Sequence, residues 1–186
     1  ASTAAVYFEN PSYHGLFETQ AAEITAIARR AGAETIVGVD PLTLGVIAPP
    51  SSYGADIAVG SIQPLGVHMH GGGGVGGFIA SRHEERYARE YPTFLVSIAP
   101  TAVAGEHGFG LSLFHQTSYG MREEGKDWTG NSTYLWTIAG AAYMALLGPQ
   151  GFVDLGRTIL ANAHAAAAKI GAIGGVRIVR PGGFFK

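Results

Sequence analysis

The chain has 186 residues, a length that suits one domain, or one domain and part of another. Hydrophobic residues make up 47% of it, charged residues only 14%, and the formal net charge is -2. This apolar composition predicts that much of the surface of this chain is buried, either against parts of the protein that the chain lacks or against a partner. No interleaving of basic and aromatic residues points to nucleic acid, and the absence of cysteine excludes disulfides and thiolate catalysis.

The N-terminal third predicts a strand-helix-strand unit. Residues 4–8 are typical of a buried strand and residues 10–12 of a turn, and residues 19–30 have the spacing of an amphipathic helix that Gly32 can end. A second apolar strand is expected over residues 35–39. This order favours a parallel sheet with a right-handed crossover.

The middle of the chain has weaker signals. Strands are expected over residues 56–60 and 77–81, followed by a charged, exposed helix over residues 82–90. Residues 93–130 are predicted to be largely irregular, with one short strand at 111–114. Long irregular segments in compact domains are usually functional or wrap a partner.

The C-terminal third predicts helices. Helix signals run over residues 133–147, and the longest apolar stretch, residues 134–147, is too short to span a bilayer and indicates a buried helix. Gly148-Pro149 should break it, and an alanine-rich helix is expected over residues 152–173. Residues 176–179 are a candidate strand that opens a small second domain. Neither end has the pattern of a natural terminus, so both are expected to be cuts within a larger fold.

Asp40 is the first candidate site residue, because it closes the predicted strand 35–39. Ligands of open α/β sheets bind beyond the carboxyl ends of the strands, and a carboxylate there can pair with the protonated ring nitrogen of pyridoxal phosphate. The alternative is structural: Asp40-Pro41 starts a turn or caps a short helix over residues 42–46.

Two further features stand close together at residues 68–74. The glycine run 71–74 could bring backbone amides near an anion or another chain, but it lacks the lysine and hydroxyl residue of a phosphate-binding loop, and a flexible hairpin is the alternative. His68 and His70 would face the same side of a strand, a spacing that can bind zinc or iron. Isolated histidine pairs are more often ordinary polar residues.

The lysines argue against imine chemistry within this chain. Lys126 lies in a charged loop, Lys169 on the exposed side of the alanine-rich helix, and Lys186 at the end of the sequence. None of them follows a strand in an apolar setting that would favour Schiff-base formation. Pro64 stands instead between an apolar strand and the glycine run, where a lysine would suit such chemistry.

Several stretches in order resemble the P-protein of the glycine cleavage system (glycine dehydrogenase, decarboxylating), and in particular its alpha subunit, or subunit 1. The resemblance spans nearly the whole chain, although residues 93–126 match loosely. The stretches that carry it are residues 39–45 with Pro49-Pro50, residues 53–60 with 63–66, and residues 130–132 opening a helix that ends at 146–151.

The resemblance implies an α/β fold of the aspartate-aminotransferase-like class (fold type I of the pyridoxal phosphate-dependent transferases), with a mostly parallel sheet flanked by helices. Residues 1–148 would be the C-terminal portion of the large domain, and residues 149–186 a helix and strand leading into a truncated small domain. The chain would cover less than half of an alpha subunit.

The resemblance also implies function. An alpha subunit pairs with a beta subunit whose lysine holds pyridoxal phosphate, and the cytoplasmic pair decarboxylates glycine and passes the aminomethyl group to the lipoyl carrier H-protein. Gln63-Pro64 takes the place of the His-Lys pair, so the cofactor would not be bound covalently here. The implied cofactor-binding residues are Asp40, Gln63, His70 and Asn131.

The chain departs from the family pattern at residues 115–122, which replace an arginine-rich stretch of the alpha subunit and leave a phosphate contact unsupported. Two other hypotheses stay open beside the resemblance. One is a non-catalytic relative that binds a partner chain or small ligand, and the other is a metal enzyme that uses His68 and His70.

Overall fold

The computed structural model describes residues 3–67, 76–91, 95–126, 133–180 and 182–186. The chain divides into two compact units. The first unit combines residues 1–80 with residues 133–186, and the second unit consists of residues 81–132.

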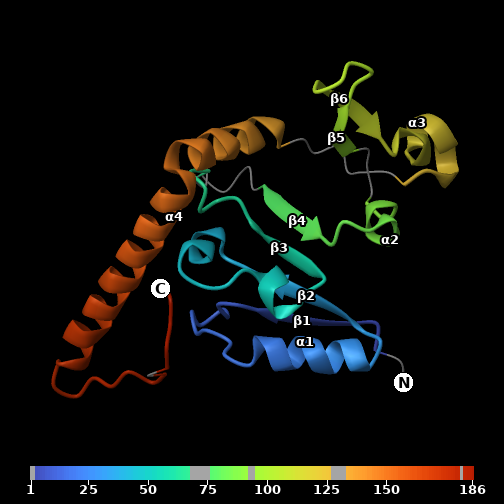
Figure 1. Cartoon of the computed structure of the whole chain (residues 1–186). Coiled ribbons are helices and arrows are strands. Elements are labelled where there is room, and N and C mark those ends of the chain that lie inside the picture. The colour runs from blue at the N-terminus through green and yellow to red at the C-terminus, as the bar shows by residue number, and fades with distance from the viewer. Residues whose placement is uncertain (1–2, 68–75, 92–94, 127–132, 181) are drawn as a thin grey trace. The chain divides into compact units, whose positions relative to one another are not determined.

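The first unit contains a four-stranded sheet in the order β1-β2-β3-β4 (Figure 1). β1 pairs with β2, and β2 with β3, both in parallel, with Ala5 opposite Glu34 and Ile36 opposite Ile57. The predicted strands are therefore confirmed, shifted by one residue at most. Their bounds are Ala5–Glu9, Glu34–Gly38, Ile57–Ser61 and Gly77–Ser81.

The helix α1 (Ala21–Arg30) connects β1 to β2 and buries Ala21, Thr25 and Ala28. Gly32 follows the helix with a φ of 72°, a left-handed conformation that glycine adopts without strain. The predicted helix and its glycine cap are thus confirmed.

Two short 3-10 helices, η1 (Pro41–Gly45) and η2 (Pro50–Tyr53), lie between β2 and β3. The buried Asp56 accepts a hydrogen bond from the Thr35 backbone N–H at 2.9 Å and donates its own backbone N–H to the Thr35 carbonyl at 3.0 Å. These bonds fix the start of β3 beside the start of β2.

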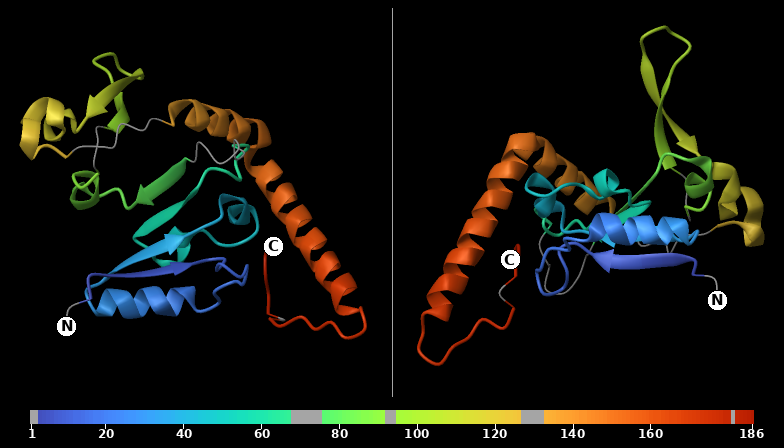
Figure 2. Two further views of the ribbon diagram at one scale, coloured as in Figure 1. Left: turned by 180° about the vertical axis from the view of Figure 1, so that it is seen from behind. Right: turned by 60° about the horizontal axis from the view of Figure 1, so that its bottom comes forward.

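The long helix α4 (Tyr134–Gly171) is kinked at Gly148, whose φ of 59° and ψ of 179° are not helical (Figures 1 and 2). Pro149 follows and has no N–H to continue the helical hydrogen bonds. The predicted break at Gly148-Pro149 is confirmed, and the two predicted helices are the two halves of α4. Within the described ranges, no helix combines the length and apolar character needed to cross a membrane.

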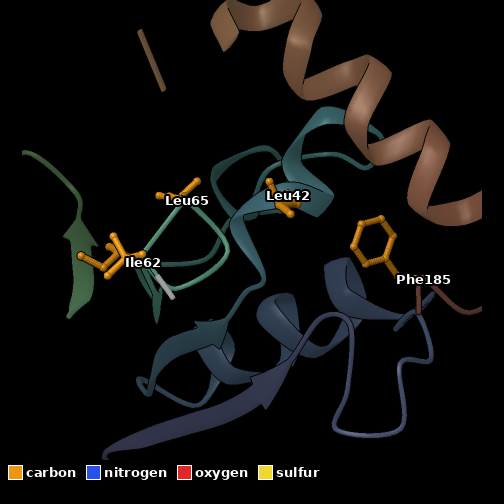
Figure 3. Close-up of a cluster of buried hydrophobic side chains, with 5 residues drawn as sticks. Leu42, Ile62, Leu65 and Phe185 are labelled. Carbon is orange, nitrogen blue, oxygen red and sulfur yellow. The ribbon is translucent and has the colours of Figure 1, made fainter. Parts of the chain in front are cut away.

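After α4 the chain turns and runs back beside the helix (Figure 1). The strand predicted over residues 176–179 is not formed: these residues are exposed and irregular, because no strand in the described part of the chain pairs with them. Instead Phe184 forms an isolated antiparallel bridge with Leu16. Phe185 is fully buried and joins a cluster with residues from η1 and from the segment after β3 (Figure 3), namely Leu42, Ile62, Leu65 and Val67.

The second unit corrects the prediction of a largely irregular segment. It contains an antiparallel hairpin of β5 (Leu95–Pro100) and β6 (His107–Ser112), so the short strand predicted at 111–114 starts earlier and ends at 112. Gly108 and Gly110 alternate with Phe109 and Leu111, and they obscured the strand pattern. The exposed helix predicted at 82–90 is reduced to α2 (Glu85–Ala88). Short helical segments follow the hairpin: η3 (Phe114–Gln116), α3 (Ser118–Met121) and η4 (Arg122–Glu124).

Candidate functional site

A cavity of about 310 Å³ opens at the carboxyl ends of β1, β2 and β3. This is the edge at which open α/β sheets bind their ligands, because the loops that follow parallel strands meet there. Its walls come from the end of each strand and from the segments that follow: Tyr7, Glu9, Pro11, Gly38, Val39, Asp40, Pro41, Val59, Gly60, Ser61 and Pro64.

Asp40 lies in this cavity and also caps η1. Its Oδ1 accepts a hydrogen bond from the Leu42 N–H at 3.0 Å, and its carbonyl accepts from the Thr43 hydroxyl at 2.6 Å. The capping role that the sequence offered as an alternative is therefore confirmed. The side chain is only 13% exposed, and its second oxygen, Oδ2, forms an ion pair with the Lys186 Nζ.

The charge of the cavity comes from two carboxylates, those of Glu9 and Asp40; its described walls include no lysine or arginine. The Tyr7 hydroxyl donates a hydrogen bond to the Glu9 Oε1 at 3.1 Å. Partial burial raises the pKa of Tyr7 above its ordinary value, and the hydrogen bond and negative charge of Glu9 raise that pKa further. The phenol is therefore held in its neutral form, and the Lys186 ammonium balances one of the two carboxylate charges.

Pro64 lies in a turn directly after β3 and forms part of the same cavity wall as Asp40. The Gln63 N–H donates to the Ser61 hydroxyl at 3.1 Å, and the Leu65 N–H donates to the Ile62 carbonyl at 2.9 Å, which together fix this turn. Proline has no amine with which to hold an aldehyde cofactor, so the side chain at this wall cannot form a Schiff base.

Of the other predicted cofactor-binding residues, the structure describes Gln63 alone. Gln63 precedes Pro64 in the turn but is not one of the described wall residues. His70 and Asn131 lie outside the described residues, as do His68 and the glycine run 71–74. Among the residues that the structure describes, no group of three metal-ligating side chains is present.

Lys186 is the site residue that sequence reasoning missed. The sequence suggested only a lysine at the end of the chain, whereas the structure brings it to Asp40. The available signal was the pair Phe184-Phe185 directly before it. Large aromatic side chains gain free energy when they are buried, and the burial of this pair holds the next residue against the fold. Lys169 is exposed on α4, as expected, and Lys126 pairs with Glu90 in the second unit.

A larger cavity of about 670 Å³ lies between η1, β4 and α4. Thr137 supplies the one polar side chain among its described walls, and the rest are apolar or glycine. The larger cavity thus offers packing space, whereas the smaller cavity offers the charged groups that chemistry requires.

The sequence model of the family described as glycine cleavage system P-protein matches residues 1–185. The chain is 34% identical over 183 residues to a probable glycine dehydrogenase (decarboxylating) subunit 1 from Sulfurisphaera tokodaii, covering 98% of this chain and 40% of that relative. It is 35% identical over 184 residues to the protein of the same name from Staphylothermus marinus, covering 99% of this chain and 39% of that relative. The chain therefore spans about two fifths of the length of these curated relatives.

Solved structures agree with this assignment. A crystal structure of glycine decarboxylase (P-protein) of the glycine cleavage system, in inhibitor-bound form, superimposes with a TM-score of 0.87 at 37% identity, over 98% of this chain and 41% of that one. A sphingosine-1-phosphate lyase from Burkholderia pseudomallei has a TM-score of 0.60 at 16% identity, over 98% of this chain and 38% of that one, and shares the fold alone. The predicted fold class, fold type I of the pyridoxal phosphate-dependent transferases, is confirmed. By this match over residues 1–185, the chain belongs to the glycine cleavage system P-protein family.

Proposed function

We propose that this chain is part of the alpha subunit of a glycine decarboxylase. In this proposal it works with a lysine-bearing beta subunit to decarboxylate glycine and to pass the aminomethyl group to a lipoyl carrier protein. Membership of the P-protein family supports the proposal, as does the name "subunit 1" that its relatives carry. Residues 1–148 would belong to the large domain and residues 149–186 would lead into the small domain.

The observation that carries the proposal is that Asp40 and Pro64 both line the same cavity. The carboxylate that such a fold uses to hold a cationic ring is present, while the position after β3 has no amine. A chain with one of these groups and not the other fits a supporting subunit whose covalent anchor belongs to another chain.

The residues present fit the ring side of pyridoxal phosphate. Asp40 has one oxygen bound to the Leu42 N–H and the other directed at a cation, which is the arrangement that a protonated ring nitrogen needs. When bound, the cofactor supplies an electron-withdrawing ring that takes up the electron pair left after loss of the glycine carboxylate. Gln63, His70 and Asn131 are the further residues that we propose to hold it.

The described cavity walls do not fit the phosphate equally well. They contain Glu9 and Asp40 but no arginine or lysine, and two carboxylates repel an anion. We therefore propose that the phosphate is held by groups beyond these walls. This division supports a site completed by a second chain.

A partner surface is supported by the hairpin of the second unit. Val96 lies opposite Leu111, and Ile98 lies opposite Phe109, so the four side chains share one face of the hairpin. All four are exposed, by 59% to 80%. Isolated two-stranded hairpins are marginally stable in water, and we propose that the beta subunit covers this hairpin apolar face.

One observation favours the alternative of a non-catalytic binding protein. Lys186 already forms an ion pair with Asp40, the carboxylate that a cofactor ring would need. The two functions differ in one assay. The chain should be produced alone and together with a lysine-bearing beta subunit, and the exchange of the glycine carboxyl carbon with labelled bicarbonate should be measured. We expect exchange with the pair and none with the chain alone; an assembled pair without exchange would favour the binding protein.

A second experiment tests the absence of a covalent anchor. The assembled pair is reduced with borohydride in the presence of pyridoxal phosphate, and the modified lysine is located by mass spectrometry. We expect the adduct on the beta subunit. An adduct on Lys186 would overturn the non-covalent arrangement, and adducts on the exposed Lys169 serve as the measure of non-specific reaction.

A further inference from the structure

The last five residues are docked onto the loop between β1 and α1 in a fixed register. The Phe185 N–H donates to the Gly15 carbonyl at 2.8 Å, and the Phe17 N–H donates to the Gly183 carbonyl at 3.0 Å. Phe184 forms the bridge with Leu16 between these two bonds. The segment is therefore held by its backbone, and the direction in which Lys186 leaves it is determined.

Two aromatic side chains anchor the same segment on opposite sides. Phe185 is fully buried in the cluster that contains Leu42, three residues before the end of η1 (Figure 3). The Phe184 ring stacks on His164 of α4 at 4.2 Å, and its carbonyl accepts a hydrogen bond from the His164 Nε2 at 2.9 Å. Leu42 is also the residue whose N–H binds Asp40, so the anchor of the segment and the site carboxylate share one structural support.

Gly15 is adapted to this docking. Its φ is 76°, and a side chain at this position would collide with the Lys186 carbonyl. Only a residue without a Cβ lets the two backbones approach so closely in this conformation. The close approach places the Lys186 side chain at Asp40.

The Asp40 carboxylate carries one negative charge, which the Lys186 ammonium neutralises. Oδ1 is occupied by the Leu42 N–H, and Oδ2 is occupied by the Lys186 ammonium. The Asp40 side chain is 13% exposed, whereas that of Lys186 is 53% exposed, so the lysine can leave for solvent at small cost while the carboxylate cannot.

We propose that Lys186 is an internal counter-ion of Asp40 that competes with a protonated aromatic nitrogen for the same carboxylate oxygen. The inference rests on the proposed function, which supplies the ligand class, and it adds that ligand binding displaces Lys186 and loosens the docked segment 182–186. An occupied site and a fully docked segment are then mutually exclusive.

Pyridoxine is the suitable probe, because it has the same ring nitrogen but neither the phosphate that the described cavity walls do not fit nor an aldehyde that reacts with lysines. Its binding to the 186-residue chain is measured by fluorescence for the unsubstituted sequence and for Lys186→Met, Lys186→Arg and Lys169→Met. We expect Lys186→Met to bind about threefold to fivefold tighter, the factor that corresponds to an exposed ion pair of ordinary strength. Lys186→Arg should bind like the unsubstituted chain, since it keeps the cation.

Lys169→Met is the matched control, because it removes the same charge from an exposed position on α4 and should leave binding unchanged. Adding Asp40→Asn to Lys186→Met should abolish the gain, which ties the effect to this carboxylate. Hydrogen exchange of the Phe185 amide should become faster when the probe binds to the unsubstituted chain, since the bond to Gly15 is released.

The inference is overturned if Lys186→Met and the unsubstituted chain bind the probe equally, if neither binds it, or if the probe slows exchange in the docked segment. Failure of the proposed function is a different result: it is the absence of bicarbonate exchange by the assembled pair, and it leaves these binding ratios unaffected.

Discussion

Gly45 at the end of η1 lies so close to the Phe152 carbonyl oxygen of α4 that no side chain fits between them. Gly156, one turn further along α4, lies close to the Leu42 carbonyl and to the Val46 side chain, a looser contact than that of Gly45. The two glycines let the site-bearing 3-10 helix pack directly on α4, and Asp40 is fixed in the cavity because η1 is fixed on α4.

Replacing Gly45 by alanine should therefore destabilise the fold. The added methyl group meets backbone atoms that cannot rotate away, and overpacking of this kind costs about 1–3 kcal/mol. Urea unfolding followed by circular dichroism measures the loss. Gly174→Ala is the control, because nothing lies within 4 Å of its Cβ position; equal stabilities for the two variants would contradict the close contact.

Replacing Phe185 by alanine should cost about 3–5 kcal/mol, since it removes a fully buried ring and leaves a cavity. Phe184→Ala is the matched control. The Phe184 ring is only partly buried against His164, so its removal should lower the unfolding free energy by less. Thermal unfolding of both variants checks the difference. An unchanged midpoint for Phe185→Ala would mean that the terminal segment is not docked as described.

Asp40 combines two roles that two substitutions can separate. Asp40→Asn keeps an oxygen that can accept the Leu42 N–H but removes the charge that pairs with Lys186, whereas Asp40→Ala removes both. Asparagine caps helices about as well as aspartate. The unfolding free energy of the Asp40→Ala variant should therefore be lower than that of the Asp40→Asn variant by about 0.5–2 kcal/mol. Denaturant titrations of the two variants measure this gap, and its absence would show that the cap contributes nothing.

The raised pKa of Tyr7 predicts a loss of stability at alkaline pH. The folded state favours the neutral phenol, so this contribution is complete below the unfolded-state pKa of about 10 and is lost as the pH rises through the higher pKa of the folded state. As the pH rises from about 9 to 11, the unfolding free energy of the Tyr7→Phe variant should fall less steeply than that of the unsubstituted chain. Burial also raises the pKa of Tyr53, so the slope should be reduced and not removed.

The hairpin apolar face predicts where partner binding is most sensitive. A double substitution, Ile98→Ser with Phe109→Ser, should weaken binding of the beta subunit by about tenfold or more, because two large side chains at a buried interface commonly contribute that much. Binding is measured by surface plasmon resonance. Tyr13→Ser, which changes a 91% exposed residue of the first unit, is the control; binding unaffected by the double substitution would place the interface elsewhere.

The elements that depend on local pattern could be predicted from the order of the amino acids alone. The apolar runs of β1, β2 and β3 and the spacing of Ala21 and Ala28 in α1 were sufficient, as was Gly148-Pro149, because each signal lies within a few neighbouring residues. The capping role of Asp40 was open to prediction for the same reason, since its partner Leu42 is two residues away.

The relationships between distant residues could not be predicted from the sequence, because they depend on how the folded chain packs. Lys186 meets Asp40 across 146 positions of sequence, and no periodicity encodes that meeting: it follows from the burial of Phe185 and from the room that Gly15 leaves. β5 was missed, and β6 was predicted to start too late because Gly108 and Gly110 interrupt its apolar pattern. Local propensity acts within a turn or a strand, whereas packing and charge pairing act through space, and the contents of this site depend on the second kind of interaction.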